Sequence, residues 1–155
     1  MKISGIVTPE ALKSVSSISS KKRLFQEIAE QASACYGLDP ALTLEALQER
    51  ENLGPTGVGH GVALPHARLA ELDRVVAVFL RLDQALDFES ADRQPVDLFF
   101  ALLAPTNAGA DHLKALALVS RTMRDANTCR KLRANTDTST LYAILTEAPA
   151  SSQAA

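Results

Sequence analysis

The sequence predicts a single α/β domain with a mixed sheet and helices on both faces. Two apolar runs at 74–81 and 95–104 are rich in β-branched and aromatic residues, which indicates strands buried on both faces. Segments with apolar residues at helical spacing flank these runs, and such alternation is typical of layered α/β proteins. With 155 residues, 46% of them hydrophobic, the chain can bury one core, and we expect no second domain.

The first third of the chain predicts two helices. Residues 1–20 are rich in serine and are expected to form an extended lead-in with at most one helical turn. A serine can cap a helix over about 21–35, and Gly37 supplies its stop. Asp39-Pro40 has the order of an N-cap and a first-turn proline, so a second helix is expected to end near Arg50.

The remaining elements are expected as follows. Residues 82–94 are polar enough to be a connection, with room for a small hairpin. Residues 107–111 lead into a helix, with short helices after it at about 126–134 and 137–147. The domain core is then about 4–147, with 148–155 as a flexible tail. Four residues of the helix after 111 should share one face: His112, Leu116, Val119 and Met123.

Composition and charge exclude several classes of protein. The chain has 16 basic and 18 acidic residues and a net charge of -2, so nothing indicates a nucleic-acid surface. Cys35 and Cys129 lie far apart without metal-ligand spacing, which favours free thiols in a reducing compartment. No apolar run reaches membrane-spanning length and no leader pattern is present. We therefore expect a cytoplasmic protein without membrane insertion.

The segment 54–69 is the candidate functional site. Its four glycines allow positive φ and close approach to a ligand, and closely spaced N–H groups in such a loop can hold an anion. His66 follows a short expected strand at 62–64, and Pro65 fixes φ just before it, so the segment can present one imidazole rigidly. The expected phosphate-loop residues are Thr56, Gly57, Gly59 and Gly61.

For His66, core packing, metal ligation and nucleophilic attack by a neutral ring nitrogen are all open. The glycines and Arg68 favour the nucleophile, because an incoming phosphate needs N–H donors and positive charge. Arg50 is the candidate phosphate clamp, the alternative being an arginine that binds carbonyls at a helix end. His112 could donate a hydrogen bond to the phosphoryl group or fix the ring, or be an exposed first-turn residue. His60 could contact a partner or substrate.

Other chemistries are less favoured. A zinc site would use up all three histidines, and no carboxylate cluster with diagnostic spacing completes it. No G-x-S-x-G motif indicates a serine hydrolase, and the glycines at 57, 59 and 61 precede neither a helical pattern nor a Walker lysine. We expect no metal and no other cofactor.

Residues 54–69 read G-P-T-G-V-G-H-G-V-A-L-P-H-A-R-L. This segment resembles the signature of phosphotransferase-system enzyme IIA proteins of the fructose/mannitol type, approximately G-S-T-G-[IV]-G-x-G-[IV]-A-[IL]-P-H-[GA]-[KR]-L. Pro55 stands where the family usually has serine, and Ala67 where glycine is frequent. Further segments agree with the family or with its nitrogen-regulatory branch: 50–51, 94–98, 111–113, 20–23 and 129–133. The resemblance covers roughly 4–147.

The resemblance implies a mixed five-stranded sheet flanked by helices and a phosphotransferase component that works through phosphohistidine. His66 would accept a phosphoryl group from an HPr-type carrier, itself charged from phosphoenolpyruvate by an enzyme I, with Arg50 and His112 as active-site support. The protein would then regulate partners by its phosphorylation state, with potassium-transport and sensor-kinase proteins among the partners that the family suggests. Two alternatives are a IIA component for sugar uptake, which passes phosphate to a IIB cysteine, and a non-catalytic binding module.

Overall fold

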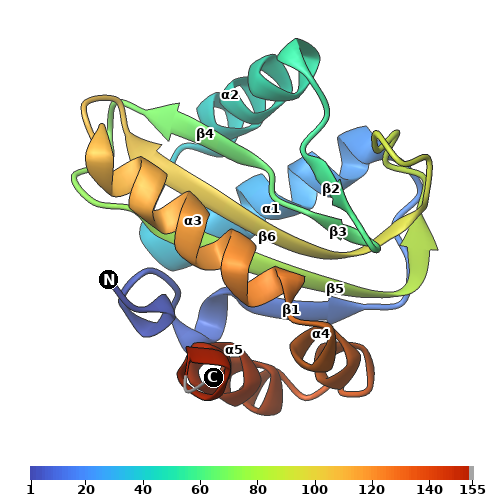
Figure 1. Cartoon of the computed structure of the whole chain (residues 1–155). Helices are drawn as coiled ribbons and strands as arrows, with labels where there is room; N and C mark the ends of the chain where they lie inside the picture. Colours follow the sequence, from blue (N-terminus) through green and yellow to red (C-terminus); the bar gives the residue numbers. More distant parts are fainter. Residues whose placement is uncertain (154–155) are drawn as a thin grey trace.

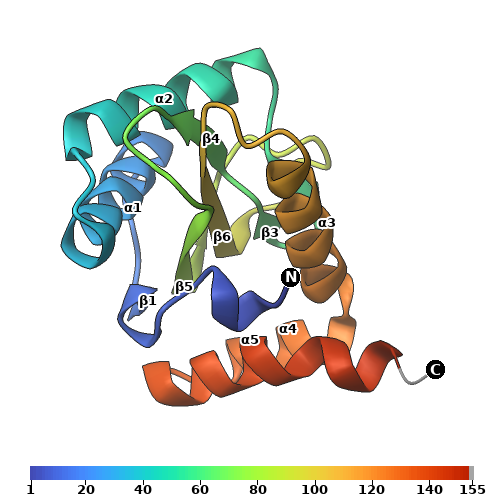
Figure 2. The ribbon, with the colours of Figure 1, turned by 90° about the vertical axis from the view of Figure 1, so that its left-hand side faces the viewer.

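A mixed sheet lies between two helical layers (Figures 1 and 2). The computed structural model describes residues 1–153, with side-chain surroundings described as far as residue 147. The strands are β1 (Leu12–Val15), β2 (Gly57–Gly59), β3 (Val62–Ala63), β4 (His66–Leu69), β5 (Val76–Leu86) and β6 (Val96–Pro105). The helices are α1 (Lys21–Tyr36), α2 (Pro40–Leu53), α3 (Ala110–Arg124), α4 (Ala126–Arg133) and α5 (Thr138–Gln153), with 3-10 turns at Ile3–Gly5 and Pro9–Ala11.

The six strand segments occupy five positions in the sheet. Their order is β1-β5-β6-β3-β2, and β4 pairs with β6 beyond the end of β3. Both β3 and β4 run parallel to β6, with Val62 opposite Leu98 and His66 opposite Leu102. The predicted α/β fold, with a mixed sheet of five strand positions and helices on both faces, is therefore confirmed.

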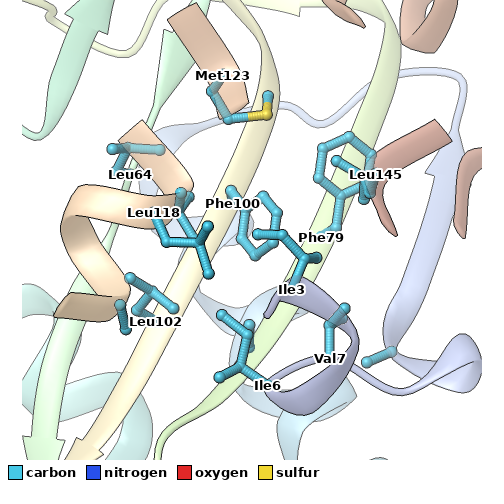
Figure 3. Close-up of a cluster of buried hydrophobic side chains, with 14 of the residues drawn as sticks. Ile3, Ile6, Val7, Leu64, Phe79, Phe100, Leu102, Leu118, Met123 and Leu145 are labelled. Carbon is cyan, nitrogen blue, oxygen red and sulfur yellow. The ribbon is translucent and has the colours of Figure 1, made fainter. Parts of the chain in front are cut away.

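The central antiparallel pair, β5 and β6, supplies apolar side chains to both faces of the sheet. Phe79 and Phe100 enter the cluster under α3 and α5, part of which Figure 3 shows. Phe99 and Leu80 point into the opposite cluster under α1 and α2. Successive strand residues face opposite sides of a sheet, so a continuous apolar run is required where both sides are covered.

The predicted helix ends are confirmed for α1 and α2. The Ser20 hydroxyl accepts a hydrogen bond from the Arg23 N–H at the start of α1, and Gly37 ends this helix with φ 71°. The Asp39 carboxylate accepts from two N–H groups in the first turn of α2. These caps satisfy helix-end donors and acceptors that would otherwise lack partners.

The prediction for residues 1–20 was wrong. Instead of an extended lead-in, this segment forms two 3-10 turns and then β1, which pairs in parallel with β5. Ile3, Ile6 and Val7 are buried against the sheet (Figure 3). A strand as short as β1 shows little periodicity in its sequence. Its stability comes from pairing with a distant strand, which a local pattern does not reveal.

Two other sheet predictions also need correction. β5 does not end at 81 but continues to Leu86, after a register irregularity against β6, so residues 82–86 form strand and the expected hairpin is absent from the described chain. β4, which begins at His66 itself, was not predicted. Three consecutive exposed residues at 83–85 give the end of β5 the appearance of a loop in the sequence.

The last helix also differs from its prediction. α5 continues past Glu147 to Gln153. The segment 148–153, expected to be a tail, therefore continues the helix, while residues 154–155 lie outside the described residues.

Candidate active site

Three elements bring the predicted site residues together. His66 begins β4, Arg50 lies in the last turn of α2, and His112 lies in the first turn of α3. In Figure 1, β4 runs between α2 and α3. A cavity of about 470 Å³ opens there, lined by Ala46, Glu49, Arg50, Leu53, His66, Ala67, Arg68, His112, Leu113 and Leu116.

The backbone just before His66 fixes its place. The Pro65 carbonyl accepts a hydrogen bond from the Leu102 N–H at 2.8 Å. Proline has no N–H, so the strand is interrupted between β3 and β4 and resumes at His66. The half-buried imidazole is thus held at the start of a strand that pairs with the central β6.

Two hydrogen bonds assign the protonation of the His66 ring. Nδ1 lies 2.9 Å from the Leu64 carbonyl oxygen, and the Arg50 Nε donates to Nε2 at 3.2 Å. A carbonyl can only accept and a guanidinium can only donate, so Nδ1 carries the proton. The lone pair is therefore on Nε2.

Arg50 makes a second contact, in which Nη1 donates to the Gly54 carbonyl at 3.0 Å. Gly54 ends α2, so Arg50 binds a carbonyl at its own helix end while it also reaches the imidazole. The contact expected of a helix-end arginine is therefore present, and the role of Arg50 as a phosphate clamp stays a prediction.

His112 lies beside His66, with ring centroids 5.6 Å apart and ring planes at 71°. The side chain is buried, which excludes the interpretation as an exposed first-turn residue. Arg68 Nε donates to His112 Nδ1 at 3.2 Å, so the proton of the neutral ring is on Nε2. That Nε2 atom is buried and has no hydrogen-bond partner among the described residues.

Burial keeps both imidazoles neutral. It is the main cause that lowers the pKa of His66 below the ordinary value of 6.5; the Arg50 guanidinium adds to this, and the hydrogen bond to Leu64 opposes it. Burial also lowers the pKa of His112, with smaller contributions in the same direction from His66 and Arg68. At pH 7, His66 Nε2 is therefore unprotonated, and its lone pair accepts the hydrogen bond from Arg50 Nε.

The glycines predicted as a phosphate loop lie elsewhere. Gly57 and Gly59 belong to β2, Gly61 lies in the turn to β3, and none of them lines the cavity around His66. At Gly57 a Cβ would lie 2.0 Å from Ser90 Oγ, and at Gly61, where φ is +77°, a Cβ would lie 2.7 Å from Arg133 Nη2. Packing and turn geometry therefore explain these two glycines, and the loop interpretation is corrected to a hairpin.

Thr56 has a structural partner as well. Its hydroxyl donates to the Glu51 carboxylate at 2.5 Å and its N–H donates to the same group at 3.2 Å. Lys21 Nζ lies 2.8 Å from this carboxylate. Thr56 thus ties the end of α2 to the hairpin that leads to His66.

His60 lies away from the cavity around His66. It is exposed, with φ 57°, in the turn between β2 and β3, where its carbonyl accepts from Arg133 Nη2 at 2.7 Å. It lines a separate cavity of about 270 Å³ beside α3 and α4. The three histidines do not converge on one metal position.

Sequence reasoning missed an apolar rim. Leu53 and Leu113 line the cavity, although 85% and 67% of their surfaces are exposed, and Leu116 and Ala46 continue the lining. Large exposed leucines around a cavity are typical of a surface that another protein covers. Leu113 could have been noticed in the sequence, because it falls off the buried face of α3.

Comparisons with known proteins agree with the fold. Residues 6–148 match the family model described as phosphoenolpyruvate-dependent sugar phosphotransferase system, EIIA 2. The chain belongs to this family. An EIIA 2 relative from Bradyrhizobium diazoefficiens, named nitrogen regulatory protein, is 47% identical over 150 residues, covering 97% of this chain and 98% of its own length. The predicted resemblance to the nitrogen-regulatory branch is thus confirmed.

Solved structures share the architecture. The nitrogen regulatory protein IIA-Ntr of Neisseria meningitidis is 33% identical with a TM-score of 0.87, covering 93% of this chain and 99% of that chain. The Escherichia coli mannitol enzyme IIA, solved in complex with phosphorylated mannitol enzyme IIB, has a TM-score of 0.75 at 18% identity over 90% of this chain and 98% of that chain, and shows the fold alone. Among residues 1–153 of this EIIA 2 protein, no helix is long and apolar enough to cross a membrane.

Proposed function

We propose that this protein is a phosphohistidine carrier in which His66 Nε2 accepts a phosphoryl group from an HPr-type protein. The observation that carries the proposal is the protonation pattern of His66, because Nδ1 is held by the Leu64 carbonyl and Nε2 keeps its lone pair in the cavity. A neutral imidazole nitrogen is a competent nucleophile. Membership of the phosphotransferase family supports this chemistry.

The transfer balances without a cofactor. The Nε2 lone pair forms the new N–P bond while the N–P bond of the donor phosphohistidine breaks, and its electron pair returns to the donor ring. The Nδ1 proton stays on His66, and the Leu64 carbonyl, 2.9 Å away, stabilises the positive charge that the ring gains. Phosphoryl transfer needs mainly alignment and neutralisation of the equatorial oxygens.

Arg50 and His112 supply that neutralisation. Arg50 Nε now points at Nε2, the atom that receives phosphorus, so its guanidinium must turn to the phosphoryl oxygens during transfer. The His112 Nε2–H is a neutral donor that lacks a partner among residues 1–153 and lies in the ring beside His66. A phosphoryl oxygen would satisfy it.

The rim around the cavity favours a protein as the phosphoryl donor. Leu53 and Leu113, on α2 and α3, would be covered by a partner of comparable size, whereas a small metabolite would leave them exposed. Burial of this rim would also exclude water from the reacting N–P bond.

The relatives that carry the name nitrogen regulatory protein support a regulatory role. Phosphorylation of His66 would place a dianionic group among the exposed leucines, so partners could distinguish the two forms by charge. We propose that this regulation takes place in the cytoplasm, where phosphoenolpyruvate is made. Potassium-transport and sensor-kinase proteins are the partners suggested by the family resemblance.

One observation favours a second candidate function. A protein of the same fold was solved with its phosphorylated enzyme IIB, so passage of phosphate from His66 to a IIB cysteine for sugar uptake is the alternative. Mixing the phosphorylated protein with a IIB protein of the same organism separates the two. Rapid loss of phosphate from His66 supports uptake, and retention supports regulation.

The proposed function is tested by incubating the purified protein with phosphoenolpyruvate, enzyme I and an HPr-type carrier, and by measuring its intact mass. We expect one acid-labile phosphoryl group in the wild type and in His60→Ala, the control histidine outside the cavity, and none in His66→Ala. No incorporation from a demonstrably charged carrier would overturn the proposal and favour a binding module without transfer activity.

A further inference from the structure

Only two side-chain atoms in the described part of the chain are buried polar groups without a hydrogen-bond partner, and one of them is His112 Nε2. An unsatisfied buried donor costs about 1–3 kcal/mol. In this protein the atom belongs to a ring beside the proposed phosphoryl acceptor, and the ring lines the cavity. The donor is therefore kept for an acceptor that arrives with the reaction.

The state of this donor depends on what happens at the other nitrogen of the ring. Arg68 Nε donates to His112 Nδ1 at 3.2 Å, and Arg68 Nη1 donates to the Thr106 carbonyl at 3.3 Å. The carbonyl anchors the guanidinium between β4 and the segment that leads into α3. With an obligatory donor at Nδ1, the neutral ring must carry its proton on Nε2 and cannot turn over without losing a hydrogen bond.

From these contacts we infer that Arg68 is a positioning residue, which holds His112 as the Nε2–H tautomer and so keeps that N–H for a phosphoryl oxygen on His66. The inference rests on the proposed function, which it deepens. It gives Arg68 a task distinct from that of Arg50, because Arg68 acts on the phosphoryl group through a second side chain. The positive charge of Arg68 also opposes protonation of His112, which agrees with its lowered pKa.

A purely structural role for Arg68 makes a different prediction. Its hydrogen bond to Thr106 joins β4 to the segment before α3, so loss of the side chain would then lower only stability. The test must therefore read the His112 ring directly. We choose Arg68→Met, which keeps the length of the stem without a donor, and Arg68→Lys, which keeps a positive donor. Arg121→Met, at an exposed position near the end of α3, is the matched control.

The first measurement is the ¹⁵N chemical shifts of the His112 ring in the unphosphorylated proteins. Wild type, Arg68→Lys and Arg121→Met should show a protonated Nε2 and a hydrogen-bonded, unprotonated Nδ1. In Arg68→Met, the ¹⁵N chemical shift of Nδ1 should move to that of a nitrogen without a hydrogen bond. The two ring shifts should then indicate a mixture of the two neutral tautomers. His112 shifts that are unchanged in Arg68→Met would overturn the inference, and this measurement needs no phosphoryl transfer.

The second measurement is the rate at which each protein accepts phosphate from a charged HPr-type carrier. We expect Arg68→Met to be about tenfold slower, as for loss of one charge-assisted hydrogen bond, with Arg68→Lys largely restored. A slow Arg68→Met with a wild-type His112 ring would mean that Arg68 touches the phosphoryl group itself, which contradicts the inference. If wild type accepts no phosphate, the proposed function fails, while the ring shifts still decide what Arg68 does to His112.

Discussion

At His66, two neighbours with opposite chemistry decide which ring nitrogen carries the proton and which keeps a lone pair. The Leu64 carbonyl can only accept and the Arg50 guanidinium can only donate, so the ring has one possible neutral tautomer. The same Arg50 contact covers the lone pair in the resting protein. If His66 accepts phosphate as proposed, the Arg50 guanidinium must release Nε2 and donate to the phosphoryl oxygens instead.

Replacement of Arg50 tests this exchange. We expect Arg50→Ala to accept phosphate about 100-fold more slowly, because one preorganised charged donor is typically worth two to three orders of magnitude. Arg50→Lys should recover only part of the rate, since lysine cannot bind two oxygens in a fixed fork. Rates are measured from a charged carrier, with circular dichroism as the folding control. An unchanged rate in Arg50→Ala would remove Arg50 from the site.

The lowered pKa values of His66 and His112 predict how the protein responds to pH. Both rings should titrate in ¹³C NMR below the ordinary value of 6.5. Unfolded histidines bind protons at higher pH than these folded ones, so their contribution to stability is present above about pH 6.5 and is lost as pH falls towards the folded pKa values. A titration of either ring at or above 6.5 would contradict the burial argument.

At the residue scale, sequence reasoning found the side chains that gather at one cavity but not the role of the glycines. His66, Arg50 and His112 were predicted together and do converge on one cavity. Gly57 and Gly61 were predicted to bind phosphate. In the structure, Ser90 and Arg133 are the neighbours that require a small residue at these positions. Both neighbours are distant in the chain, so no local pattern could reveal them.

At the element scale, the end of α2 is tied to the hairpin before His66 by the carboxylate of Glu51, which is nearly buried. It accepts two hydrogen bonds from Thr56 and pairs with Lys21 at the start of α1. Glu51 thus connects three elements with one side chain. This connection holds the hairpin that leads directly into β3 and β4.

Loss of this carboxylate should destabilise the fold. We expect Glu51→Ala to lower the free energy of unfolding by about 2–4 kcal/mol, because Lys21 and Thr56 would lose a shared partner of low exposure. Urea denaturation measures this, with Glu45→Ala at an exposed position of the same helix as control. A change below about 0.5 kcal/mol, the usual size for surface substitutions, would show that the connection carries no stability.

The predicted elements were most accurate where local chemistry decides them. Ser20, Gly37 and Asp39 fix the ends of α1 and α2 by short-range hydrogen bonds, and these ends agreed with prediction. β1 and β4 were missed because their partners are distant strands, with β1 against β5 and β4 against β6. When two paired strands are far apart in the sequence, a four-residue strand carries little local pattern that predicts the pairing.

At the scale of the whole molecule, Arg81 joins the sheet to the C-terminal helices. This buried side chain of β5 donates to the carbonyls of Leu132 at 3.0 Å and Arg133 at 2.5 Å, at the end of α4. It also donates to Ser14 Oγ of β1 at 3.1 Å. The guanidinium thereby binds helix-end carbonyls that need donors and fixes α4 below the sheet.

Arg81→Met should therefore lower the free energy of unfolding without changing the rate of phosphate acceptance. We expect a loss of about 2–4 kcal/mol, because several acceptors of low exposure would lose their donor. Phosphate acceptance by the folded fraction should remain at the wild-type rate, since Arg81 does not line the cavity around His66. Urea denaturation and a transfer assay check the two parts, with the exposed Arg93→Met as control. A slower transfer at full stability would contradict this assignment.

The whole-molecule prediction succeeded because apolar runs define the sheet. β5 and β6 were located by composition, and a sheet with two buried faces requires helices on both sides. The rim of Leu53 and Leu113 was not foreseen, because a single exposed leucine is common and only the fold gathers the two around one cavity.

The central claim is that phosphate enters at Nε2 of His66. The most direct test is long-range ¹H–¹⁵N correlation of the phosphorylated protein, prepared with phosphoenolpyruvate, enzyme I and an HPr-type carrier. We expect one phosphorylated ring, His66, with phosphorus on Nε2 and the proton on Nδ1. Phosphorus on Nδ1, or on any residue other than His66, would contradict the account.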